Sequence, residues 1–81
     1  ILQDKQGFMW FGTKDGLNRY DGLSFRKFKH DDRTRRSIGN NFITALYEDS
    51  KGDIWVGTDV GLYIYHPEKD SFRHFAELNI P

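Results

Sequence analysis

The stretch DSKGDIWVGTDVGLYIY, residues 49–65, repeats a pattern already present as DKQGFMWFGTKDGLNRY, residues 4–20. The two copies lie 45 positions apart and carry the same residue types at fixed places. These are Asp4, Gly7, Trp10, Gly12, Thr13 and Gly16 in the first copy and Asp49, Gly52, Trp55, Gly57, Thr58 and Gly61 in the second. Since a period of roughly 20 to 50 residues is typical of solenoid and propeller proteins, this repeat predicts a repeat architecture.

Each copy predicts a set of short β-strands. Aromatic and β-branched residues form runs separated by Gly, Asp, Asn or Ser about every eight to twelve positions, as in proteins built from β-hairpins. No segment keeps the helical period over a useful length. We expect strands at residues 1–3, 8–13, 17–21 and 24–28 in the first unit and at residues 42–48, 53–58, 62–66 and 71–76 in the second.

The turns between these strands follow from their sequences. DKQG and DSKG place Asp first, where its carboxylate accepts backbone N–H groups, and Gly last, where a positive φ costs little. Gly16 and Gly61 end the next connection of each unit for the same reason, and the hydroxyls of Thr13 and Thr58 suit them to tie that loop. We therefore expect the repeated residues to serve the scaffold.

Two strands of the second unit are apolar on both faces, because the runs 54–56 and 62–65 do not alternate between apolar and polar residues. A four-stranded sheet of this size cannot cover both of its faces, so each unit needs a neighbour on either side. This requirement favours an all-β fold of four-stranded antiparallel propeller blades. A two-sheet sandwich is the alternative, but it would expose the apolar outer face of each sheet to solvent.

The propeller interpretation gives the repeated Trp and Gly residues specific places. Trp10 and Trp55 are expected to lie between adjacent blades. Gly12 and Gly57 stand in the middle of strands, where a missing side chain usually means that another group comes close. We divide the chain into a first blade at residues 1–28, a linker at 29–41, a second blade at 42–76 and the start of a further linker at 77–81. The innermost strand of the first blade is expected to be truncated, as in a piece of a larger propeller.

Composition excludes several classes of protein. The 12 Lys and Arg residues balance 12 Asp and Glu residues, which argues against nucleic acid or an acidic membrane as the main partner. The charges are uneven, with nine basic and five acidic residues before residue 43 and three basic and seven acidic residues from there on. The absence of cysteine rules out disulfides without fixing the compartment. No apolar run is long enough to span a membrane.

The pattern D-x-x-G-x-x-W-x-G-T-x-x-G-L-x-x-Y at residues 4–20 and 49–65 resembles the two-component regulator propeller repeat. The linker SIGNNFI, residues 37–43, is similar to that family's S-L-x-x-N-x-I approach to a new inner strand, with Gly39 the least typical position. The resemblance implies part of the periplasmic sensor region of a hybrid two-component histidine kinase. It also implies oligosaccharide ligands and control of glycan-use genes.

The linker is the segment in which we expect local function. In a propeller it emerges at the same end as the middle hairpin loops, and loops on a rigid scaffold commonly carry binding residues. Arginine side chains there could bind a carboxylate or sulfate of an acidic glycan through two hydrogen bonds. The alternative is a solvated loop whose charges are balanced by Asp31 and Asp32. The candidate ligand-binding residues are Arg33, Arg35, Arg36, Asn40, Lys14 and Asp59.

Catalysis, cofactors and metals are not expected. The three histidines, His30, His66 and His74, do not have the spacing of metal ligands, and no cysteine supports them. No serine stands in the sequence context of a nucleophile, and no carboxylate pair is marked as a glycosidase site.

Two function classes stay open at this point. The chain is either part of a ligand-sensing propeller or a purely structural and oligomerising pair of blades. Two blades alone leave apolar faces uncovered, so we also expect self-association, as a ring of three or four copies or by edge pairing. The basic first unit of one copy would then meet the acidic second unit of the next.

Overall fold

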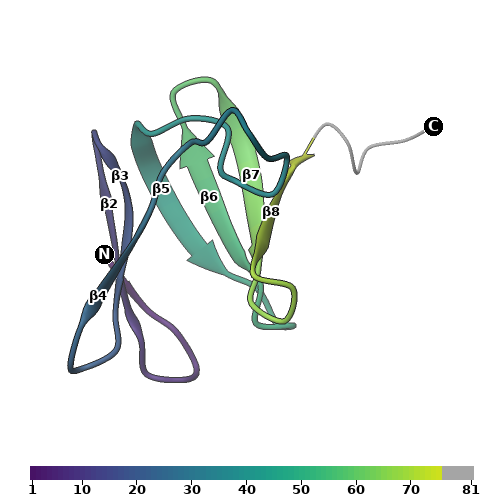
Figure 1. The fold of residues 1–81 in the computed structure, drawn as a ribbon. Coiled ribbons are helices and arrows are strands. Elements are labelled where there is room, and N and C mark those ends of the chain that lie inside the picture. The colour runs from purple at the N-terminus through teal and green to yellow at the C-terminus, as the bar shows by residue number, and fades with distance from the viewer. Residues whose placement is uncertain (76–81) are drawn as a thin grey trace.

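The computed structural model describes residues 1–75, which form two four-stranded antiparallel sheets, each ordered as the strands follow in the chain (Figure 1). The first sheet contains β1 (Leu2–Gln3), β2 (Met9–Thr13), β3 (Gly16–Tyr20) and β4 (Phe25–Phe28). The second contains β5 (Ile43–Glu48), β6 (Ile54–Thr58), β7 (Gly61–His66) and β8 (Ser71–His74). No helix among the described residues is long and apolar enough to cross a membrane.

The all-β prediction with two antiparallel blades is confirmed. Most strand ends lie within one residue of the expected ones. Strand β3 begins at Gly16 because this residue is the ladder partner of Thr13 at the end of the hairpin. The expected strand at 71–76 is seen as β8, which ends at His74, and the expected blade end and further linker at 76–81 lie outside the described residues.

Cross-strand register gives each blade two distinct faces. In blade 1, Trp10 is opposite Arg19 and Leu17 is opposite Phe28, which places all four on the same side of the sheet. We call this side the tryptophan face, and in blade 2 it carries Trp55. The other side of blade 2, the inner face, carries residues that are buried against blade 1: Ile54, Val56, Tyr65 and Phe72.

The core of the molecule is the contact between the tryptophan face of blade 1 and the inner face of blade 2. Trp10 is 1% exposed and its ring lies 5.6 Å from that of Phe28 and 5.5 Å from that of Tyr65. Phe28 in turn lies 5.7 Å from Phe72. Ile38 from the linker completes this cluster, so the linker is part of the core as well as a connection.

Trp10 therefore lies between two blades, as expected, whereas Trp55 does not reach blade 1. Trp55 is half-buried on the open tryptophan face of blade 2, where Phe75 lies 5.8 Å from it. Tyr47 on the same face is 66% exposed. The position of Trp55 in its own blade is the same as that of Trp10, but the described residues provide no third blade to cover it.

The two mid-strand glycines have close neighbours, as the sequence predicts. A Cβ atom on Gly12 would collide with the side chain of Ile43, which belongs to the innermost strand of the other blade. A Cβ atom on Gly57 would lie 3.2 Å from Thr44 Oγ1 and 3.4 Å from the Cβ of Ala45, within its own blade. The same sequence position is thus filled by the next blade in one case and by the next strand in the other.

Candidate functional site

The linker at residues 29–41 runs from the outer strand of blade 1 to the inner strand of blade 2, across the end that carries the β2–β3 and β6–β7 hairpins (Figure 1). It is hydrogen-bonded to the first hairpin, where Gly16 N–H donates to the Asn41 carbonyl at 2.7 Å. Immediately after it, the Phe42 carbonyl accepts from Asp59 N–H of the second hairpin at 3.1 Å. The linker and both hairpins therefore form one connected surface.

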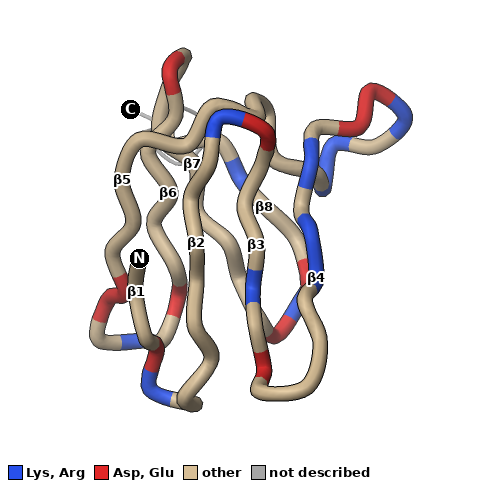
Figure 2. Tube along the Cα trace, turned by 90° about the vertical axis from the view of Figure 1, so that its left-hand side faces the viewer, with Lys and Arg blue, Asp and Glu red and all other residues tan. Residues whose placement is uncertain are grey.

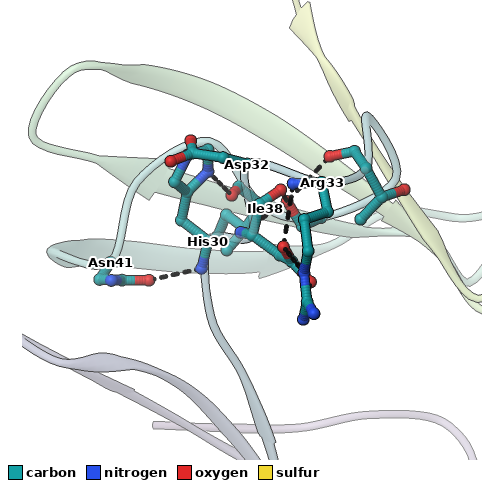
Figure 3. A network of polar contacts seen from close by, with 8 residues as sticks. His30, Asp32, Arg33, Ile38 and Asn41 are labelled. Atoms are coloured by element: carbon teal, nitrogen blue, oxygen red, sulfur yellow. Dashed lines mark hydrogen bonds and ion pairs between the residues drawn. The ribbon is translucent and has the colours of Figure 1, made fainter.

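His30 closes the base of the linker loop (Figure 3). Its backbone N–H donates to Asn41 Oδ1 at 2.7 Å, while its ring lies between two acceptors. Nδ1 is 2.9 Å from the Ile38 carbonyl and Nε2 is 2.5 Å from Asp32 Oδ1. Because a carbonyl and a carboxylate only accept, both ring nitrogens donate only if His30 is an imidazolium.

The surroundings of His30 agree with this protonation state. The Ile38 carbonyl, followed by the Asp32 carboxylate, raises the pKa of the imidazole above its usual value. A raised pKa means that these bonds contribute to stability below the ordinary pKa of 6.5 and lose that contribution as the pH rises through the higher folded-state value. These contacts of His30 therefore hold the loop most firmly below about pH 6.5.

Two of the three linker arginines are used by the protein itself. The Arg33 guanidinium holds Asp31 through Nε at 3.0 Å and Nη2 at 3.1 Å, which lowers the pKa of that carboxyl group. Arg36 reaches across to blade 2, where its Nη2 donates to the Lys69 carbonyl at 2.5 Å. These two arginines stabilise the loop and its attachment.

Arg35 differs from both, because it makes no hydrogen bond or ion pair with any residue in 1–75. It lines an open cleft of about 500 Å³ between the linker and the outer half of blade 2. Aromatic rings line the same cleft, since Tyr63 of β7 and His74 of β8 are cross-strand partners stacked 4.7 Å apart. Gly39 faces this pair closely enough that a Cβ atom would collide with the Tyr63 hydroxyl.

The other candidates lie at the hairpin end, apart from this cleft. Lys14 Nζ stands 5.9 Å from the Phe42 ring centre, and the Asn40 side-chain oxygen accepts from Phe42 N–H at 2.9 Å. Asp59 is exposed at the tip of the second hairpin. The six predicted residues thus do not converge on one point, since Arg36 extends to the β7–β8 loop while Lys14, Asn40 and Asp59 lie at the hairpin end.

Charge at this end is mixed. Figure 2 shows blue and red segments side by side on the linker loop, which projects at the β4 edge of the molecule. The neighbouring Asp15 carboxylate is 3.0 Å from Lys29 Nζ and 3.4 Å from Lys27 Nζ, and these lysines lower its pKa. Lys27, Lys29 and Arg33 therefore each have a carboxylate neighbour.

Sequence reasoning did not identify Tyr63, His74 and His30 as neighbours in a cleft. The only signal for the ring stack is cross-strand register, which pairs residue 63 with residue 74. No group of three or more His, Asp or Glu residues suited to a metal occurs within residues 1–75. His66, for example, has Asp53 alone at 3.2 Å from Nδ1.

A second feature that sequence reasoning missed lies in the repeated turns. Besides accepting backbone N–H groups, the Asp4 carboxylate accepts the indole N–H of Trp10 at 2.8 Å. Asp49 and Trp55 repeat this bond at 2.9 Å. The constant spacing of six residues between Asp and Trp in both copies is the signal that could have revealed it. These carboxylates are structural and lie at the end opposite to the linker surface.

Comparison with known proteins adds three findings. A family model described as the two component regulator propeller matches residues 1–15 and 37–60. The chain is 45% identical over 38 residues, 47% of its length, to histidine kinase P4 of Formosa agariphila. It is also 38% identical, with a TM-score of 0.80 over 91% of its length, to a crystal structure named as the extracellular domain of a hybrid two-component system of B. thetaiotaomicron. The chain spans only 3% of that kinase and 11% of that crystal structure.

Proposed function

Because this chain is built from two-component regulator propeller repeats, we propose that it forms part of the extracytoplasmic sensor propeller of a hybrid two-component regulator. In this proposal the propeller is periplasmic and senses oligosaccharides, and its signal controls transcription of genes for glycan use. The matched family is a propeller repeat and not a catalytic domain, so the chemistry of signalling belongs to other parts of such a regulator.

The observation that carries this proposal is the placement of the linker. It joins the loop ends of two rigid blades through backbone hydrogen bonds and presents polar side chains next to an open cleft. Ligand sites commonly form on loops that a rigid scaffold positions. A ligand that contacts two blades here would shift the equilibrium between their arrangements by its difference in affinity for them.

The proposal is tested by titrating the complete sensor region with a panel of oligosaccharides and then changing residues in the linker. We expect one class of oligosaccharide to bind and alanine substitution of the three linker arginines to weaken it. Unchanged affinity in the Arg33→Ala, Arg35→Ala and Arg36→Ala variants would argue against ligand contact by this blade pair.

The open sheet faces favour a second candidate, in which these blades serve only as scaffold or oligomerisation surface. Tyr47 and Phe75 on the tryptophan face of blade 2 are 66% and 41% exposed, and Phe25 on the opposite side of blade 1 is 65% exposed. Within the chain, the tryptophan face of blade 1 packs on the inner face of blade 2. A second copy could cover the exposed faces by repeating this contact. A second copy would stack in the same head-to-tail sense.

This candidate predicts self-association of the 81-residue chain. Light scattering should give a mass about three or four times that of the 9.6 kDa chain for a closed ring, or twice that mass for edge pairing. Tyr47→Glu should reduce the mass to that of one chain. Val60→Glu is the matched control, because Val60 is 63% exposed at a hairpin tip and not on a sheet face. A sharp monomer mass for the unmodified chain would exclude this candidate.

A further inference from the structure

The cleft beside Arg35 has the composition of a small-ligand site. Its floor includes the stacked rings of Tyr63 and His74, with the buried Phe72 next to them. Its rim comes from the linker and carries Arg35 and Ser37. Ring surfaces combined with a small number of polar groups are typical of sites that bind small molecules.

The cleft is also complete within residues 1–75. All of its lining residues belong to the linker, β7 or β8. The linker is held against the outer edge of β8, where Phe72 N–H donates to the Arg36 carbonyl at 2.8 Å. Ile38 anchors the other side of the loop in the core, where it is 0% exposed. Contacts within the chain therefore hold the walls of the cleft in place without a ligand.

The electrostatics of the cleft leave one positive group available. Arg33 Nε lies 3.0 Å from Asp31 Oδ1, and His30 Nε2 lies 2.5 Å from Asp32 Oδ1. The guanidinium of Arg33 offsets the charge of Asp31, which would otherwise repel an anion. Arg35 is the remaining linker arginine, and it has no partner within residues 1–75. A guanidinium binds a carboxylate or sulfate through two parallel hydrogen bonds.

We propose that this cleft binds an acidic sugar, with Arg35 holding its carboxylate or sulfate and the Tyr63 ring packing against the sugar ring. The inference rests on the proposed function, since it names the chemical class of oligosaccharide and the place where it binds. It also divides the linker arginines into Arg35, which contacts the ligand, and Arg33 and Arg36, which hold the loop.

The test uses calorimetric titration of the 81-residue chain with three probes. These are a tetragalacturonate, which carries carboxylates; a sulfated heparin tetrasaccharide; and the neutral tetragalactose. We expect at least one acidic probe to bind and the neutral probe to bind about tenfold more weakly or not at all. Amide NMR should show the largest shifts at Gly39, Tyr63 and His74.

Two variants locate the charge that matters. Arg35→Gln should weaken binding of the acidic probe by about tenfold or more, because it removes a charged group that makes two hydrogen bonds to the ligand. Lys51→Gln is the matched control, since it removes the same charge from an exposed turn at the opposite end. Arg35→Lys should restore less than the full affinity, because an ammonium lacks the planar fork.

The outcomes separate this inference from the proposed function. Equal weakening by Arg35→Gln and Lys51→Gln would indicate general electrostatic attraction and overturn the cleft. Suppose that the neutral probe binds as tightly as the acidic probes and that Arg35→Gln does not change its affinity. This result would also overturn the cleft proposal, while leaving oligosaccharide sensing intact. Absence of binding by all three probes would overturn the cleft alone, whereas a complete sensor region that bound no oligosaccharide would overturn the proposed function as well.

Discussion

Blade 1 and blade 2 contain the same tryptophan in the same local structure, yet the two side chains have different surroundings. Trp10 and Trp55 each donate an indole N–H to the aspartate that opens the preceding turn, at 2.8 and 2.9 Å. Trp10 is 1% exposed because Tyr65 of the other blade covers it, whereas Trp55 remains half-buried. The comparison shows that the repeated motif fixes the orientation of the ring, while burial depends on the neighbouring blade.

The largest expected difference between the blades is therefore at these two residues. Trp10→Ala should lower the free energy of unfolding by about 3 to 5 kcal/mol, because it opens a cavity in the only interface between blades that residues 1–75 form. Trp55→Ala should cost less than half as much. Urea denaturation followed by circular dichroism measures both.

Fluorescence gives a check that does not require the alanine variants to fold. The Trp55→Phe variant, which retains only Trp10, should emit at shorter wavelength than the Trp10→Phe variant, because Trp10 is shielded from water. Identical emission from the two variants would show that Trp55 is covered as well as Trp10, which self-association would explain.

A smaller difference is expected at the mid-strand glycines. In Gly12→Ala the new methyl group would displace Ile43, a residue that is 7% exposed in the interface, so we expect a loss of about 1 to 3 kcal/mol. Gly57→Ala meets Thr44 Oγ1 at 3.2 Å, an exposed side chain that can adjust, and should cost less than about 1 kcal/mol. Thermal unfolding of the two variants compares them, and a costlier Gly57→Ala would contradict the assigned packing.

Acid should weaken the turn of blade 2 through the Asp49 carboxylate. The indole N–H of Trp55, followed by backbone N–H groups, lowers the pKa of Asp49 below its ordinary value of 3.8. Because the folded-state pKa is lower, the contribution to stability is present above pH 3.8 and is lost as the pH falls through the folded-state value. The urea midpoint should therefore fall between about pH 5 and about pH 3. The Asp49→Asn variant should show a shallower fall.

The smallest expected effect is at the ion pair that joins the blades at the β7–β8 loop. Arg26 Nη2 lies 2.8 Å from Asp70 Oδ2, but the two side chains are 47% and 50% exposed. A double-mutant cycle with Arg26→Ala and Asp70→Asn should give a coupling below about 1 kcal/mol that decreases as salt is added. A coupling of several kcal/mol would show that the blades depend on this pair more than on the aromatic core.

Sequence reasoning predicted the features that arise within one repeat. The strands, the Asp-first turns and the hydroxyl bond from Thr13 to the Gly16 carbonyl, at 2.8 Å, all depend on residues close together in the chain. The candidate site was harder to predict, because it depends on which partners the linker arginines find. Whether Arg33 meets Asp31 or a ligand is decided by loop geometry, and three neighbouring arginines look alike in a sequence.

The uneven charge distribution illustrates the same limit. The sequence indicated attraction between the basic and acidic halves of different copies. In the structure, opposite charges already meet within one chain, since Arg26 of blade 1 pairs with Asp70 of blade 2 at 2.8 Å. The Glu48 carboxylate is used differently, because both of its oxygens accept the backbone N–H of Lys5 at 3.1 Å. Apolar faces are the stronger basis for any self-association.

The backbone hydrogen bond between Phe72 and Arg36 protects the edge of β8 independently of the side chains in the loop. An outer strand with free N–H and C=O groups is a template for unwanted pairing with other chains, and the linker occupies part of that edge on β8. This protection uses the carbonyl of residue 36, whereas ligand selection would use side chains such as Arg35. Substitutions that retune recognition can therefore accumulate in the loop without opening the blade to aggregation, provided that the path of its main chain is kept.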